Sequence, residues 1–69
     1  MDVLVVGGTG FIGQHLCRAL DEQGHAVTAL SRSPEDATLP DGVETVAGDV
    51  TDYGSIESAF EGQDAVVHL

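Results

Sequence analysis

The stretch that decides the fold lies near the start of the chain and reads Val3-Leu4-Val5-Val6-Gly7-Gly8-Thr9-Gly10-Phe11-Ile12-Gly13. Its first four residues are an unbroken apolar run, which is typical of a strand buried on both faces of a parallel sheet. The glycines that follow fit two spacings at once, Gly8-x-Gly10-x-x-Gly13 and Gly7-x-x-Gly10-x-x-Gly13. A tight turn, a close approach of backbone to a phosphate, and close packing of a helix on the strand each exclude a Cβ. The stretch therefore predicts a strand followed by a phosphate-binding turn.

A helix is expected directly after this turn, over residues 11–22. Its apolar residues recur at helical spacing and should form the face of the helix that packs on the sheet; they are Ile12, Leu16, Ala19 and Leu20. The unpaired N–H groups at the start of such a helix point back at the turn and favour an anion there. The alternative is a tight turn that binds nothing, but the strand before and the helix after favour a dinucleotide site.

The remaining sequence predicts four more elements, which are strands over 26–30, 43–47 and 64–69 and a helix over 53–60. Gly24 and Gly62 stand where the two helices should stop, and Thr51 or Asp52 could cap the second helix. The fold class is therefore α/β, the N-terminal half of a Rossmann-type NAD(P)-binding fold, with a parallel sheet in strand order 3-2-1-4. We expect residues 1–69 to be one partial domain, truncated at the fourth strand, because a bare buried strand would expose its edge.

Composition narrows the range of partners. The chain has twelve acidic residues against two arginines and no lysine, with a net charge of -10, and its acids form no continuous block. Because nucleic acid and anionic membranes are bound through basic patches, we expect neither as a partner. High salt screens the self-repulsion of such a charge, so a halophilic source is our hypothesis. The absence of a basic leader segment and of a membrane-length apolar run predicts a cytoplasmic protein.

Few other residues suggest chemistry. Cys17 is single, which excludes an internal disulfide, and it is interpreted as a small hydrophobe of the first helix. The histidines at 15, 25 and 68 are scattered without the spacing of a ligand set, so no metal site is assigned. His15 could touch a phosphate near the helix start, although packing is the favoured interpretation, and His68 is interpreted as a strand residue.

Four segments together resemble the extended short-chain dehydrogenase/reductase superfamily, specifically its NAD(P)-dependent epimerase/dehydratase group. They are residues 5–13 (Val-Val-Gly-Gly-Thr-Gly-Phe-Ile-Gly), 30–33 (Leu-Ser-Arg-Ser), 48–52 (Gly-Asp-Val-Thr-Asp) and 64–69 (Asp-Ala-Val-Val-His-Leu). The resemblance covers essentially the whole chain but only the first half of the family's nucleotide-binding domain. It implies a dinucleotide cofactor as the partner and allows a homo-oligomer of the whole protein.

The resemblance implies a role for each residue of the glycine turn. Gly7 and Gly10, with Thr9 between them, would lie against the pyrophosphate of the cofactor. Phe11 and Ile12 would offer backbone N–H groups to it, and their side chains could also pack in the core. Gly13 would let the helix approach the strand.

The same resemblance implies contacts to the adenosine half of the cofactor. Asp49 and Val50 would hold the adenine ring, with the carboxylate accepting from its exocyclic amine; the alternative for Asp49 is a turn-former or a charge at the helix entry. Leu69 would lie where the chain passes the ribose. Ser31 and Arg32 end the second strand, where an acid favours NAD and an arginine accommodates a 2′-phosphate. NADP is therefore the preferred cofactor over NAD, unless Arg32 is simply exposed to solvent.

No catalytic residue is assigned. The superfamily's reaction uses a tyrosine with a lysine four residues later, whereas Tyr53 has Glu57 in that place and the chain has no lysine. Three functions therefore stay open. The chain could be the cofactor-binding part of an oxidoreductase or epimerase acting by hydride transfer, a non-catalytic NAD(P)H-binding protein similar to the respiratory complex I accessory subunit or a redox-sensing regulator, or a structural remnant that binds nothing.

Overall fold

The computed structural model describes residues 1–7, 10–32, 38–49 and 51–69. Its elements, in chain order, are β1 (Asp2–Val6), α1 (Phe11–Glu22), β2 (Ala26–Ser31), β3 (Glu44–Ala47), α2 (Tyr53–Phe60) and β4 (Ala65–His68). Both helices begin and end where the sequence predicts, and the strand ends differ from the prediction by one residue at most. The predicted order of elements is confirmed.

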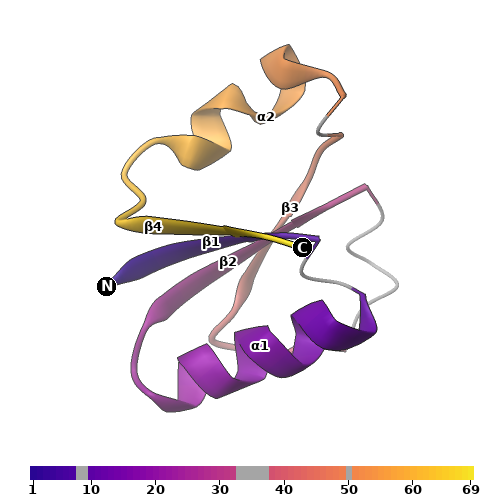
Figure 1. The fold of residues 1–69 in the computed structure, drawn as a ribbon. Helices are drawn as coiled ribbons and strands as arrows, with labels where there is room; N and C mark the ends of the chain where they lie inside the picture. Colours follow the sequence, from indigo (N-terminus) through magenta and orange to yellow (C-terminus); the bar gives the residue numbers. More distant parts are fainter. Residues whose placement is uncertain (8–9, 33–37, 50) are drawn as a thin grey trace.

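The four strands form one parallel sheet in the order β3-β2-β1-β4, as predicted. Helix α1 covers one face of this sheet and α2 covers the other (Figure 1). Strand β1 is internal, paired with β2 on one side and with β4 on the other. At its start, Asp2 N–H donates to Asp64 Oδ2 at 2.8 Å, and Asp64 N–H donates to Asp2 O at 2.7 Å. These two hydrogen bonds therefore join the start of β1 to the residue that precedes β4, although the two are far apart in the sequence.

Side chains of the strands alternate between two apolar clusters, one on each face of the sheet. The cluster on the α1 side contains Val3, Val5, Cys17, Val27, Ala29 and Val43. The cluster on the α2 side contains Leu4, Val6, Leu30 and Ile56. Because β1 contributes to both clusters and its residues 3–6 are all buried, it is the two-sided buried strand that its apolar run predicts.

The face that α1 turns to the sheet differs from the predicted one. Gly13 and Cys17 are its buried residues, with Leu16 partly buried beside them. Ile12 is 70% exposed and Ala19 is also exposed, so the prediction that both belong to the buried face was wrong. Gly13 has no side chain, which lets the helix lie close to the strand, and residues four apart then share that face.

Glycine ends both helices, and the predicted cap of α2 is absent. Gly24 and Gly62 have φ values of 89° and 77°, the left-handed conformation expected just after a helix. Asp52 occupies the N-cap position of α2, but its side chain makes no capping hydrogen bond. Thr51 donates to Asp49 instead, so the prediction of a side-chain cap was wrong.

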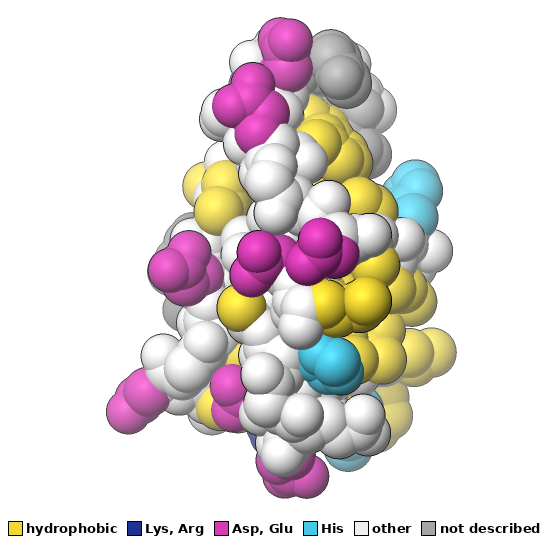
Figure 2. Space-filling model, turned by 90° about the vertical axis from the view of Figure 1, so that its left-hand side faces the viewer, with side chains coloured by type: hydrophobic (Ala, Val, Ile, Leu, Met, Phe, Trp, Pro, Cys, Tyr) yellow, Lys and Arg dark blue, Asp and Glu magenta, His cyan; other side chains and the backbone are white. Residues whose placement is uncertain are grey.

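Acidic side chains are numerous on the face of the molecule seen in Figure 2. Figure 2 shows carboxylate side chains spread over one face from top to bottom, separated by other side chains. Among the described residues, no helix has the length and apolar content needed to cross a bilayer. The described residues also contain no group of three metal-ligating side chains placed to hold an ion.

Candidate functional site

A cavity of about 490 Å³ lies at the carboxyl edge of the sheet, where parallel α/β folds bind their ligands. Strands β1, β2 and β4 and the loop that follows β3 all contribute to its walls. Its lining residues are Val6, Gly7, Gly10, Leu30, Ser31, Arg32, Gly48, Asp49, Thr51, His68 and Leu69. The cavity therefore joins four segments that are far apart in the sequence.

The first wall is the turn that leaves β1. Gly7 has a φ of 88°, a conformation that side chains rarely adopt, and its N–H donates to Leu30 O at 2.9 Å. Gly10 N–H donates back to Gly7 O at 3.2 Å, and Gln14 N–H makes the first bond of the helix to Gly10 O at 2.8 Å. The N–H groups of residues 11–13 precede that bond, so they are the donors that this helix start can offer to an anion.

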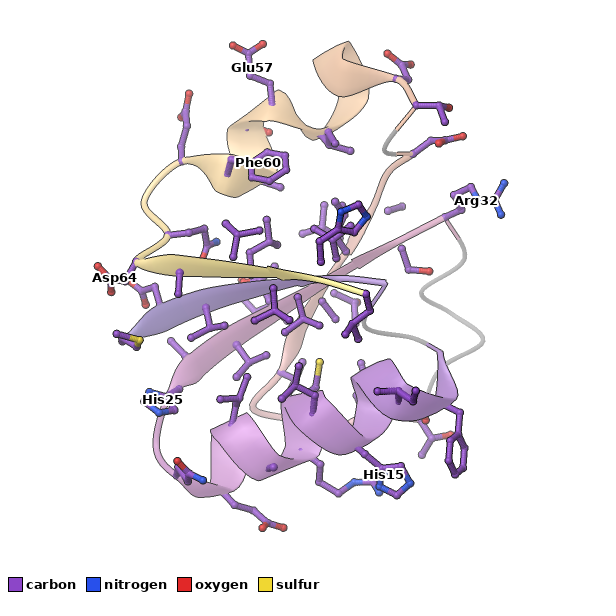
Figure 3. All side chains as sticks on the ribbon, viewed as in Figure 1. His15, His25, Arg32, Glu57, Phe60 and Asp64 are labelled. Carbon is purple, nitrogen blue, oxygen red and sulfur yellow. The ribbon has the colours of Figure 1, made fainter. Side chains whose placement is uncertain are left out.

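The second wall is the end of β2. Ser31 is half-buried and paired in register with Ala47 of β3, while Arg32 follows it and is exposed. Figure 3 shows the Arg32 guanidinium extending beyond the carboxyl edge of the sheet. Its positive charge is close enough to contribute to the lowered pKa of Asp49. The cation is thus placed at the mouth of the cavity.

The third wall is the loop that leaves β3, and it is organised by Asp49. Thr51 donates to Asp49 Oδ1 twice, from its backbone N–H at 2.9 Å and from its hydroxyl at 2.8 Å, and Asp52 N–H donates to Asp49 O at 2.9 Å. The backbone hydrogen bond from Thr51, followed by the hydroxyl bond and by the charge of Arg32, lowers the pKa of Asp49. Asp49 is therefore a turn-former and, at the same time, a fixed negative charge in the cavity wall.

Gly48 sets how closely this loop approaches the sheet. Its N–H donates to Ser31 O at 2.9 Å. A Cβ on Gly48 would overlap the Ile56 Cγ2 of α2 and would lie 3.1 Å from Leu30 Cδ1. Only a glycine lets the loop pass between β2 and α2 without displacing either, and this passage positions Asp49.

The end of β4 closes the site beside the glycine turn. Leu69 N–H donates to Val6 O at 3.1 Å, and a Cβ on Gly7 would lie 3.6 Å from Leu69 Cβ. The Leu69 side chain is 53% exposed. It therefore presents an apolar surface next to the turn.

The cavity brings together six of the residues that the sequence singles out, which are Gly7, Gly10, Ser31, Arg32, Asp49 and Leu69. Gly13 is buried against the sheet in the first turn of α1, as expected. Phe11 and Ile12 also lie in this turn, but their side chains are 80% and 70% exposed, so the alternative that they pack in the core is wrong. The predictions for Thr9 and Val50 concern positions outside the described residues.

Five lining residues were not assigned to the site from sequence: Val6, Leu30, Gly48, Thr51 and His68. A signal for Thr51 existed in the Asp-x-Thr spacing, because an aspartate often binds the backbone two residues on. A signal for His68 existed in the alternation of the last strand, which places it on the same face as Val66. Val6, Leu30 and Gly48 lie in the segments that carry the family resemblance, but no contact with the cofactor was assigned to them.

The parallel sheet, the glycine turn before α1 and the cavity at the strand ends define a Rossmann-type dinucleotide-binding domain. Residues 7–69 match a family model described as NAD(P)H-binding, and the chain belongs to that family. Its similarity to the epimerase/dehydratase group of extended short-chain dehydrogenases, expected from the four motifs, is confirmed by solved structures.

Several curated relatives are described as reductases or dehydrogenases. The chain is 46% identical over 68 residues to a 2-alkyl-3-oxoalkanoate reductase of Stenotrophomonas maltophilia, which covers 99% of this chain and 21% of that protein. It is 38% identical over 66 residues to a 3-beta-hydroxysteroid dehydrogenase of Mycolicibacterium neoaurum, with 96% and 18% of the two chains covered. The chain thus spans about a fifth of the length of these relatives.

Solved structures of nucleotide-binding enzymes are also similar to this chain. A UDP-glucose 4-epimerase superposes with a TM-score of 0.88 at 30% identity, over 100% of this chain and 22% of that one. The enzyme WbmG of Bordetella bronchiseptica, solved in complex with NAD, superposes with a TM-score of 0.84 at 31% identity, over 100% and 24%. The chain is therefore an NAD(P)-binding domain whose homologues are oxidoreductases and epimerases.

Proposed function

We propose that this chain is the cofactor-binding part of an extended short-chain dehydrogenase/reductase that uses NADPH in preference to NADH. The observation that carries the proposal is the single cavity that joins the glycine turn, Arg32 and Asp49 at one edge of the sheet. A dinucleotide needs a phosphate site and a nucleoside site side by side, and this edge offers both.

The pyrophosphate is assigned to the turn over residues 7–13. Gly7 and Gly10 line the cavity without side chains, so a phosphate can approach the backbone closely. The N–H groups of Phe11, Ile12 and Gly13 lie at the positive end of α1 and stabilise an anion. Thr9 belongs to the same stretch of sequence and to the same proposal.

The adenosine half is assigned to the other side of the cavity. Arg32 pairs with the 2′-phosphate of NADPH, beside Ser31 at the end of β2. Asp49 and Val50 hold the adenine ring, and a carboxylate oxygen can accept from the exocyclic amine in addition to Thr51 because it has several lone pairs. Leu69 packs against the ribose next to the turn.

The reaction of the whole protein is proposed from its relatives. A nicotinamide cofactor supplies or accepts a hydride when bound, and the residues described here bind and orient it. Relatives described as reductases and dehydrogenases support an oxidoreductase over a non-catalytic nucleotide-binding protein. The tyrosine and lysine that perform acid–base chemistry in the family are assigned to sequence outside these residues.

The test is a titration with NADPH and with NADH, followed by nicotinamide fluorescence, with circular dichroism to monitor folding. We expect NADPH to bind more tightly, and Arg32→Ala to weaken NADPH binding by about tenfold or more while NADH binding is unchanged, because one charged hydrogen bond is lost. The matched control is Arg18→Ala, which removes the chain's other arginine from the surface of α1, where it donates to Thr38 O at 3.4 Å. Equal loss in both variants, or a folded chain that binds neither dinucleotide, contradicts the proposal.

A further inference from the structure

Thr51 lines the cavity, but the proposed function gives its hydroxyl no role in cofactor binding. The hydroxyl donates to Asp49 Oδ1 at 2.8 Å. Helix α2 begins two residues later, and its N-cap residue Asp52 makes no side-chain capping bond. The hydroxyl of Thr51 therefore serves the carboxylate in the cavity wall and not the start of the helix.

The backbone around Asp49 is held on both sides. Gly48 N–H donates to Ser31 O at 2.9 Å, and Asp52 N–H donates to Asp49 O at 2.9 Å. With the backbone held in this way, the position of the carboxylate depends on its two side-chain torsions, and the second of these has a broad, roughly twofold preference. The backbone alone therefore does not decide which way the two carboxylate oxygens point.

Thr51 supplies the missing restraint because it donates twice to one oxygen. Its N–H and its hydroxyl reach Asp49 Oδ1 at 2.9 Å and 2.8 Å. Rotation of the carboxylate would break both bonds, so Oδ2 keeps one orientation. The backbone bond and then the hydroxyl bond also lower the pKa of Asp49, so at neutral pH the carboxylate is ionised and both of its oxygens are acceptors.

We propose that Thr51 is a positioning residue for base recognition: its hydroxyl holds the Asp49 carboxylate so that Oδ2 accepts from the exocyclic amine of adenine, and the site thereby selects adenine over hypoxanthine. The inference rests on the proposed function, which places the adenine ring at Asp49. Hypoxanthine carries a carbonyl oxygen where adenine carries that amine, and a carboxylate held in place repels this oxygen. A carboxylate that turns freely would bind adenine less well and would move away from hypoxanthine.

The probes are NADPH and its hypoxanthine analogue, reduced nicotinamide hypoxanthine dinucleotide phosphate. Both carry the same pyrophosphate and 2′-phosphate, so the glycine turn and Arg32 contribute equally to the two affinities. Nicotinamide fluorescence measures both dissociation constants at one KCl concentration that keeps the protein folded, which circular dichroism checks. We expect the wild type to bind NADPH about tenfold or more tightly than the analogue, the size of one hydrogen bond to a charged group.

Thr51→Val removes the hydroxyl and keeps both the backbone bond and the branched shape of the side chain. The preference for NADPH should fall by about threefold or more, whereas Thr51→Ser, which keeps the hydroxyl, should retain it. A loop that is merely loosened would weaken both dinucleotides equally and leave their ratio unchanged. The matched control is Thr45→Val, at an exposed position of β3 outside the cavity lining, which should also leave the ratio unchanged.

Substitutions of Asp49 test the orientation directly. In Asp49→Asn, Thr51 should still donate to the amide oxygen and so turn the NH₂ group toward the base. This variant should prefer the hypoxanthine analogue, whose carbonyl oxygen accepts from that group, and Thr51→Val should weaken the reversed preference. Asp49→Ala leaves no carboxylate to position, so adding Thr51→Val should change the ratio no further.

The possible failures are distinguishable. An unchanged ratio in Thr51→Val would overturn the inference and leave the proposed function intact. A further loss when Thr51→Val is added to Asp49→Ala would do the same, because the hydroxyl would then contact the base itself. Equal wild-type affinity for the two dinucleotides would overturn both the inference and the assignment of adenine to Asp49. No binding of either dinucleotide to the folded protein would overturn the proposed function as well.

Discussion

Residues 1–32, which form β1, α1 and β2, and residues 33–69, which include β3, α2 and β4, differ sharply in charge. The first segment holds three of the twelve acidic residues and both arginines, for a net charge of -1. The second holds the other nine acidic residues and no arginine or lysine, for a net charge of -9. Nearly all the self-repulsion of the chain therefore arises in its second segment.

The two segments differ in burial as well. Strands β1 and β2 contribute seven of the ten buried apolar residues of the described chain, namely Val3, Leu4, Val5, Val6, Val27, Ala29 and Leu30. In contrast, β3 and β4 contain no fully buried residue, and Ile56 is the buried residue that α2 contributes. The glycine turn thus belongs to the well-packed segment, whereas Asp49 and His68 belong to the weakly packed segment.

Salt concentration should produce the largest effect. We propose that the chain is adapted to high salt, and we expect it to fold in molar KCl and to lose structure in low-salt buffer, because screening relieves the repulsion. The loss should begin in the second segment. Circular dichroism follows the whole transition, and amide hydrogen exchange compares the protection of α2 with that of β1. Full folding in low salt, with equal protection of α2 and β1, would contradict both the proposed salt adaptation and the expected difference between the two segments.

Matched valine substitutions compare the two segments by packing alone. Val27 of β2 is 2% exposed and belongs to the α1-side cluster, whereas Val46 of β3 is only partly buried. Val27→Ala should lower the free energy of unfolding by about 2–3 kcal/mol, and Val46→Ala by less than about 1 kcal/mol. Denaturant titrations measure both, and equal losses would show that the second segment is packed as tightly as the first.

Two glycines within the second segment should respond in opposite directions. Gly48→Ala should destabilise the protein by about 1–2 kcal/mol, since the added Cβ overlaps Ile56 Cγ2. Gly54→Ala lies in α2, where the nearest atom to the added Cβ is Asp52 Oδ1 at 3.6 Å, and should stabilise by up to about 1 kcal/mol. Thermal unfolding of each variant gives the sign. A neutral Gly48→Ala would mean that α2 shifts freely and that the loop is loosely held.

Lowering the pH through the titration of Asp49 should produce the smallest and most local effect on stability. The folded-state pKa of Asp49 is lowered chiefly by Thr51, so its contribution to stability is present above the ordinary carboxyl pKa of about 3.9 and is lost as the pH falls through the lowered value. Thr51→Val removes the hydroxyl bond and should raise the pKa of Asp49 towards its ordinary value, whereas Thr51→Ser should preserve it. Carbon-detected NMR titration of the Asp49 carboxyl measures the shift, and no difference between the two variants would assign the lowering to the Thr51 backbone N–H, which both variants keep.

The elements were predictable because each carries its own local signal. A strand is indicated by the apolar run at residues 3–6, and a helix by the apolar period of residues 53–60. The ends of the two helices are indicated by the glycines at 24 and 62. None of these signals depends on the rest of the chain. Their assembly followed from the handedness of crossovers between parallel strands. Most of the predicted cavity residues follow from that assembly, because the strand ends must meet at one edge.

What the sequence did not reveal depends on small rotations and close contacts. Ile12 fits the helical period of α1, but the helix turns Gly13 and Cys17 to the sheet and leaves Ile12 exposed. Thr51 could have capped α2, yet its hydroxyl bonds the carboxylate two residues before it. For Thr51 the cap and the bond to Asp49 are alternative local hydrogen bonds, and spacing alone does not decide between them.

The pairing of Asp2 with Asp64 at the start of β1 has a consequence for synthesis on the ribosome. Strand β1 emerges first, but the strand that covers its second edge emerges some 60 residues later. Nascent chains that end before β4 should therefore expose that edge and remain sensitive to protease until Ala65–His68 has left the exit tunnel.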